Sequence, residues 1–120
     1  MNKLYYKILV TILNVLYHSF IRYNNKVYKL QSRGKEEKAT KLVMKATKTV
    51  VTMCLINKEI KSFVDDVNEK IKNESEITRG EYKAYMYIAS VSETVYLRTE
   101  QARSFCLCLC DEFFKGGVEL

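Results

Sequence analysis

Residues 35–71 read KEEKATKLVMKATKTVVTMCLINKEIKSFVDDVNEKI, and this stretch decides the fold. Apolar side chains recur in it every three or four residues, which is the spacing of one face of an α-helix. The apolar stripe comprises Ala39, Leu42, Val43, Ala46, Val50, Met53, Cys54, Ile60, Phe63, Val64, Val67 and Ile71. This pattern predicts helical structure whose apolar side faces a protein core.

The opposite side of the same stretch carries a row of lysines. Lys38, Lys41, Lys45 and Lys48 fall within an arc of about 80° at helical spacing. Such a row suits the phosphates of nucleic acid or the headgroups of an anionic membrane. An ordinary solvated face has the same pattern. Arginine, which reads bases, is absent from the row, and no aromatic residue interleaves with it, so the row itself provides no stacking platform for bases.

The composition indicates one all-α domain spanning residues 1–120. The chain has no proline and only four glycines, too few turn formers for a β-sandwich, while 48% of its residues are hydrophobic. An unbroken helix over residues 35–71 would be about 55 Å long, too long for a compact domain with a radius of gyration near 14 Å. We therefore expect a break near Asn57, which would cap a second helix.

The rest of the chain divides at four further places. Gly34 ends the preceding segment, because glycine adopts backbone conformations that helices exclude. Residues 20–32 contain Asn24-Asn25 and fit either a short hairpin or the end of one helix followed by another. Residues 78–81, Thr-Arg-Gly-Glu, form a capping box that opens a central helix near 79–97, with neighbours on several sides. A last helix runs from about residue 99 to Gly116-Gly117. The expected fold is a compact bundle of about five helices.

Residues 4–21 form the most apolar run of the sequence and leave three readings open. They fit a buried helix in the bundle, a membrane anchor or a cleaved secretion signal. Lys7 and the shortness of the run count against an anchor, and large residues such as Tyr17 crowd the only plausible cleavage region. We favour the buried helix, in which His18 is a buried or interfacial side chain rather than a general base.

The four cysteines favour reduced thiols in an intracellular, cytoplasmic protein. Cys106, Cys108 and Cys110 lie too close together to bridge one another, and Cys54 stands alone. On a helix, Cys106 and Cys110 share one face while Cys108 points away, so Cys108 is the predicted reactive thiol. This spacing does not match a structural zinc site, and we expect neither a metal nor a cofactor.

The sequence favours binding without catalysis. It contains no phosphate-binding glycine loop, nucleophile elbow or zinc-binding helix motif. Our leading hypothesis is a regulatory module that docks a partner protein, or a second copy of itself, through an apolar surface lined by Tyr82, Tyr85 and Tyr96. The alternatives are binding of nucleic acid or an anionic surface through the lysine row, and a membrane-anchored subunit held by residues 4–21.

Overall fold

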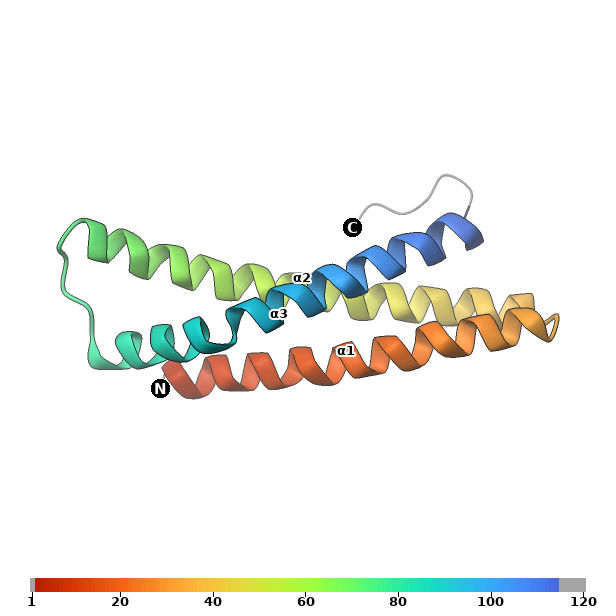
Figure 1. Cartoon of the computed structure of the whole chain (residues 1–120), viewed down its shortest axis with the longest axis horizontal. Coiled ribbons are helices and arrows are strands. Elements are labelled where there is room, and N and C mark those ends of the chain that lie inside the picture. Colours follow the sequence, from red (N-terminus) through yellow and green to blue (C-terminus); the bar gives the residue numbers. More distant parts are fainter. Residues whose placement is uncertain (1, 115–120) are drawn as a thin grey trace.

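The computed structural model describes residues 2–114, and three long helices account for nearly all of them (Figure 1). The helices are α1 (Asn2–Ser32), α2 (Glu36–Lys72) and α3 (Arg79–Phe113). This part of the chain contains no strand, so the predicted all-α class is confirmed. The predicted number of about five helices is wrong, because the expected internal breaks do not occur.

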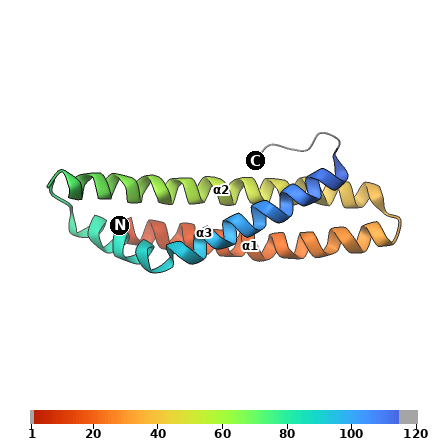
Figure 2. The ribbon, with the colours of Figure 1, turned by 45° about the horizontal axis from the view of Figure 1, so that its top comes forward.

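A tight turn at Gly34 joins α1 to α2. Gly34 has a φ of +73°, in the left-handed region where a side chain is strained. The amide of Lys35 donates to the carbonyl of Leu30 at 2.9 Å, which closes the end of α1. The predicted break at Gly34 is confirmed. α1 and α2 then run antiparallel and side by side (Figure 2).

α1 passes without interruption through residues 20–32, so neither a hairpin nor a helix break occurs there. Asn24 and Asn25 cost helix stability only weakly, since asparagine has a modest propensity penalty compared with glycine or proline. Phe20 and Val27 are fully buried two turns apart and keep one face of the helix against the core. Tertiary packing therefore outweighs the local turn signal of the two asparagines.

α2 likewise continues through Asn57, which corrects the predicted break. Met53, Ile56 and Ile60 are buried on either side of Asn57, so the apolar stripe stays in phase across it. The break was predicted from the length limit of a compact domain, and the molecule is not compact. The molecule instead measures 60 × 25 × 18 Å with a radius of gyration of 17.6 Å. An elongated bundle accommodates a 37-residue helix without a break.

α3 begins at the predicted capping box, which is confirmed. The amide of Glu81 donates to the Thr78 hydroxyl at 3.1 Å, and the amide of Thr78 donates to the Glu81 carboxylate at 3.2 Å. The helix then passes through Thr99, where a second helix was expected to start. Thr99 is buried and donates its hydroxyl to the carbonyl of Val95 at 2.8 Å, so the helix itself satisfies this polar group. The predicted stop at Gly116-Gly117 lies outside the described residues.

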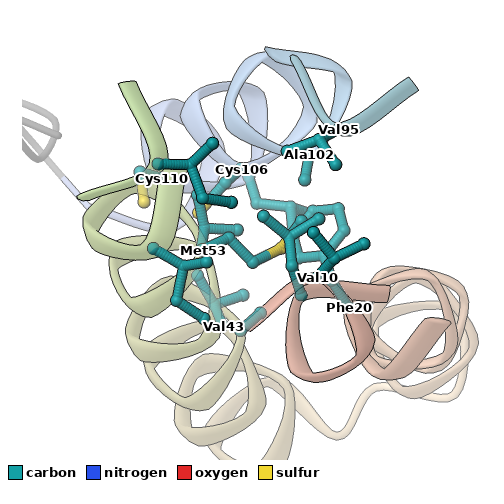
Figure 3. Packing of buried hydrophobic residues seen from close by; sticks show 14 of the residues in the cluster. Val10, Phe20, Val43, Met53, Val95, Ala102, Cys106 and Cys110 are labelled. Atoms are coloured by element: carbon teal, nitrogen blue, oxygen red, sulfur yellow. The ribbon is translucent and has the colours of Figure 1, made fainter. Parts of the chain in front are cut away.

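The three helices share one core. α3 starts beside the N-terminal end of α1 and crosses diagonally to the first half of α2, so residues 79–97 are not a central helix surrounded by neighbours (Figures 1 and 2). Side chains from all three helices converge between them (Figure 3). The largest fully buried hydrophobic ones are Phe20, Leu13, Met53, Ile88, Leu109, Val27, Val43, Val50, Val67, Val95 and Cys106.

Polar side chains link each pair of helices around the rim of this core. The Tyr5 hydroxyl of α1 donates to the Glu59 carboxylate of α2. α3 is tied to α1 by Arg98, which donates to Asn14 Oδ1 at 2.6 Å. It is tied to α2 by Lys70, whose Nζ lies 2.6 Å from a Glu81 carboxylate oxygen. These contacts join each pair of helices at the edge of the core, where the side chains are exposed or half-buried.

Candidate functional site

The predicted lysine row lies at the end of the bundle where α1 turns into α2. All four lysines are exposed, as predicted. Lys38, Lys41 and Lys45 line one side of a groove of about 360 Å³, and Lys26 and Leu30 of α1 line the other. Lys48 extends the row along α2 but does not line the groove. The turn at Gly34 thus places cations from two helices around one hollow.

A second groove of about 480 Å³ adjoins the first on the α1 side. Lys26 and Leu30 line both grooves, so the two form one continuous basic surface. Within the described part of the chain, no carboxylate lines either groove. The members of this basic surface are Arg22, Asn25, Lys26, Lys29, Leu30, Arg33, Lys38, Lys41, Leu42 and Lys45.

The charge of the protein is concentrated here. Residues 22–48 contain seven lysines and two arginines against two glutamates, a net charge of +7, whereas the whole chain carries +6. One of the two acids, Glu37, pairs with Lys41 at 3.6 Å, and both side chains of this pair are largely exposed. Such a pair offsets little of the local charge. The basic surface therefore has a strongly positive potential.

The fold adds an aromatic ring that the lysine row lacks in sequence. The Nζ of Lys45 lies 5.6 Å from the centre of the Tyr23 ring, which belongs to α1 and is half-buried. This distance permits a cation–π contact that holds the ammonium group at the groove. Because Tyr23 is half-buried, only part of its ring is open to solvent for stacking with bases.

Sequence reasoning missed the α1 half of the basic surface. Arg22, Lys26, Lys29 and Arg33 recur at spacings of four, three and four residues, which is the same helical signal that identified the row on α2. The signal is obscured in the sequence because residues 20–32 fit a hairpin as well as a helix. A strand would have divided these side chains between its two faces, Arg22 and Lys26 on one and Lys29 and Arg33 on the other.

The three candidate tyrosines of α3 differ in exposure. Tyr82 and Tyr96 are exposed and point outward with Met86 and Leu97, which are also exposed. Tyr85 is half-buried, and its hydroxyl donates to Asn68 Oδ1 of α2 at 2.7 Å. Tyr85 is therefore part of the contact between α2 and α3, while Tyr82 and Tyr96 remain available on an exposed apolar strip.

α1 is not a helix buried in the middle of a bundle, which corrects the favoured reading of residues 4–21. One face packs in the core, but Leu4, Ile8, Ile12 and Val15 are exposed. His18 is exposed too, with its ring edge-on to Tyr17 at a centroid distance of 5.6 Å, so the expected buried or interfacial histidine is wrong.

The residues that the sequence also offered as a membrane anchor, 4–21, lie within α1. Among the described helices, α1 alone is long and apolar enough to cross a membrane, and 22% of its most apolar window is buried in the bundle. A core helix or a signal sequence meets the same criteria of length and composition.

The cysteines take the places that the helical spacing predicts. Cys108 is exposed, whereas Cys106 and Cys110 are buried, and Cys54 is half-buried. The Thr47 hydroxyl lies 3.5 Å from both buried sulfurs (the Cys106 and Cys110 side chains appear in Figure 3). Burial raises the pKa of the Cys106 thiol to about 11. Residues 2–114 hold no group of three or more His, Cys, Asp or Glu side chains arranged to bind a metal ion.

Another groove lies at the opposite end, where α2 and α3 diverge. It measures about 550 Å³ and is lined by the paired Lys70 and Glu81 together with Tyr5, Asp66 and Glu69, among others. The Lys70 ammonium holds the pKa of Glu81 below its ordinary value of 4.5, and it is the largest cause of this shift. The hydrogen bond from the backbone amide of Thr78 is the next largest cause. These contacts serve the helix start and the link to α2, and they arrange no nucleophile beside a base.

Comparison with protein-family models, with curated proteins and with solved structures finds no significant match. The function is therefore inferred from the surfaces of the molecule.

Proposed function

We propose that this protein is a non-enzymatic binding module that takes a phosphate-bearing polyanion on its basic surface. The observation that carries this proposal is the pair of adjoining grooves lined by cations from α1 and α2, with no carboxylate among their described lining residues. Lys26 lines both grooves, so it would contact a ligand bound in either one. No cofactor is needed for binding of this kind.

Electrostatics supports a polyanionic partner. Seven like-charged side chains around two hollows repel one another, and an incoming anion relieves that repulsion. Lys and Arg that neutralise several phosphates also release the counterions condensed on the polyanion, which makes binding favourable and strongly dependent on salt. The net charge of +7 over residues 22–48 distinguishes this surface from a solvated face of mixed charge.

Titration of the full chain with inorganic polyphosphate tests this proposal. The affinity should fall by more than about tenfold between 50 and 200 mM salt, as expected for release of several counterions. The variant Lys38→Gln, Lys41→Gln, Lys45→Gln should lose most of the binding. A variant with the same charge change at exposed positions of the other half of α2, Lys58→Gln, Lys61→Gln, Lys72→Gln, should retain it. Equal losses in the two variants would show that only net charge matters and would remove the basic surface as a site.

A partner protein bound through α3 is the second candidate, and a specific observation favours it. Tyr82, Met86, Tyr96 and Leu97 form an exposed strip on the first half of α3, with exposed fractions of 50–57%. Tyrosine and methionine are enriched at interfaces, where they give large contact areas. Sedimentation of the full chain at 0.5 M salt tests the version in which a second copy is the partner. A dimer that Tyr96→Ser dissociates supports it, and a monomer at all concentrations excludes it.

A further inference from the structure

We propose that the polyanion is the surface of an anionic membrane, on which α1 lies flat with its outer face against the lipid. This inference rests on the proposed function and names the ligand of the same basic surface. The observation behind it is that one face of α1 is apolar in its first half and basic in its second half. The two halves correspond to the two chemistries of a bilayer surface, the acyl boundary and the headgroups.

The face is defined by helical spacing. Residues 4, 8, 12, 15, 22, 26, 29 and 33 fall within an arc of about 100° at 3.6 residues per turn. The residues of α1 that enter the core, Tyr6, Val10, Leu13, Phe20 and Val27, centre on the opposite side. The outer face therefore points away from the shared core, and its basic half borders the groove that α1 forms with α2. Its apolar and basic halves each extend over about 17 Å.

The apolar half is a continuous stripe rather than a scatter of exposed residues. Leu4, Ile8, Ile12 and Val15 have exposed fractions of 61%, 49%, 42% and 59%. Together with Lys7 and Thr11, three of these residues line a shallow groove of about 290 Å³ on the outside of α1. Four large aliphatic side chains in a row on a solvent-facing helix mark a surface that another apolar phase covers.

The basic half follows on the same face. Arg22, Lys26, Lys29 and the residue after the helix, Arg33, are all exposed, and they line the second groove of the basic surface. Lys38, Lys41 and Lys45 of α2 lie alongside them. Long lysine and arginine side chains can reach headgroup phosphates while aliphatic residues on the same helix enter the acyl boundary.

Other occupants match this face less well. Two copies packed through α1 in parallel would oppose four cations to four cations. An antiparallel pair in full register would oppose the apolar half of each copy to the basic half of the other. A nucleic acid backbone offers phosphates for the basic half but nothing apolar for the residues from Leu4 to Val15. An anionic lipid surface satisfies both halves at once.

The proposed pose also differs from a transmembrane α1. Tyr6, Val10 and Leu13 belong to the shared core. The centre of the Tyr6 ring lies 4.5 Å from the centre of the Phe63 ring of α2. A helix that crossed the bilayer would remove these side chains from α2 and α3. A helix that lies in the interface keeps them in place and uses the outer face alone.

Vesicle co-sedimentation of the full chain tests the inference. The probes are phosphatidylcholine vesicles with and without about 30% phosphatidylserine, and inorganic polyphosphate in a parallel titration. The apolar variant is Leu4→Gln, Val15→Gln. Its matched control is Val51→Gln, Leu55→Gln, which changes the same residue types at exposed positions of α2. The basic variant is Arg22→Gln, Lys26→Gln, Lys29→Gln, with Lys58→Gln, Lys61→Gln, Lys72→Gln as its control.

We expect binding to phosphatidylserine vesicles that both test variants weaken by about tenfold or more and both controls leave intact. Polyphosphate binding should survive in the apolar variant, and salt or carbonate washes should release the wild type from vesicles. If the apolar variant binds vesicles as well as the wild type does, the membrane inference is wrong while the proposed function stands. The inference is also wrong if the protein binds duplex DNA more tightly than vesicles. It is wrong too if only detergent, and neither salt nor carbonate, releases the protein from vesicles. If the protein does not bind polyphosphate and binds vesicles through its apolar half alone, the proposed function is wrong, and so is the inference built on it.

Discussion

Lys26 of α1 and Lys45 of α2 line the same groove, although eighteen residues, including the turn at Gly34, lie between them in the chain. The antiparallel pairing of α1 and α2 brings these two cations together. Each helix alone carries a row of positive charge, and the turn at Gly34 makes one surface from the two rows.

This juxtaposition predicts that removing charge there does not harm the fold. The variant Lys38→Gln, Lys41→Gln, Lys45→Gln, Lys48→Gln replaces exposed side chains and relieves repulsion between like charges. Its thermal midpoint should equal or exceed that of the wild type at low salt. The wild type should gain stability as salt rises and the variant should gain less, because salt screens the repulsion. Loss of the helical circular-dichroism signal in the variant would mean that these lysines are not on the surface.

The continuity of α2 can be tested at Lys58, an exposed residue just after Asn57. Lys58→Pro should destabilise the protein by about 3 kcal/mol or more, because proline in a helix interior removes a hydrogen bond and clashes with the preceding turn. If a separate helix began after Asn57, proline at its first position would be tolerated. Urea denaturation distinguishes the two cases. Lys58→Ala, which favours the helix, should leave stability unchanged or slightly raised.

Phe20 is the largest fully buried side chain of the core. Phe20→Ala should cost about 3–5 kcal/mol of unfolding free energy, from lost burial and the cavity left between the helices. Val15→Ala on the exposed face of the same helix should change stability by less than about 0.5 kcal/mol. Chemical denaturation measures both variants. Comparable losses would show that the outer face of α1 is packed and would argue against its proposed role.

The thiols should react in the order of their exposure. Cys108 should be modified first by a thiol reagent under native conditions, because its side chain is open to solvent. Cys54 should follow slowly, since burial raises its pKa and reduces the thiolate fraction. Cys106 and Cys110 should react only on unfolding. Mass spectrometry of the labelled peptides gives the order, and early labelling of Cys106 would contradict the packing of α3 on α2.

Glu81 should make part of the stability depend on pH. Its pKa is lowered in the folded state by Lys70 and the Thr78 amide, so the folded protein resists protonation of this carboxylate. The resulting stabilisation is fully present above pH 4.5, the ordinary pKa, and is lost as the pH falls below it. Glu81→Gln should therefore reduce stability at pH 7 and flatten its fall below pH 4.5, measured by denaturation at each pH. An unchanged pH profile would show that the contact with Lys70 does not persist in solution.

The cap itself is a separate contribution. Thr78→Ala removes the acceptor for the amide of Glu81 and should cost about 1 kcal/mol, the usual value for losing a threonine cap. Thr78→Ser retains the hydroxyl and should restore most of that stability. Thermal denaturation of the two variants tests the assignment, and equal effects would show that the hydroxyl does not cap α3.

The sequence by itself determined the features that depend on local chemistry and helical period. The all-α class, the turn at Gly34, the cap at Thr78, the outward lysines and the exposure of Cys108 all follow from spacing and from backbone preferences. These features involve residues within a few positions of one another.

Only the tertiary structure decided whether weak local signals became breaks. Asn24-Asn25, Asn57 and Thr99 lie within helices because buried neighbours such as Val27, Ile60 and Ala102 keep the apolar stripe continuous across them. Burying that stripe outweighs a propensity penalty of a few tenths of a kcal/mol. The same packing joined the basic rows of α1 and α2 and left half of an apolar helix uncovered. Both outcomes depend on which helix faces are used in the core, and that is a property of the assembled bundle.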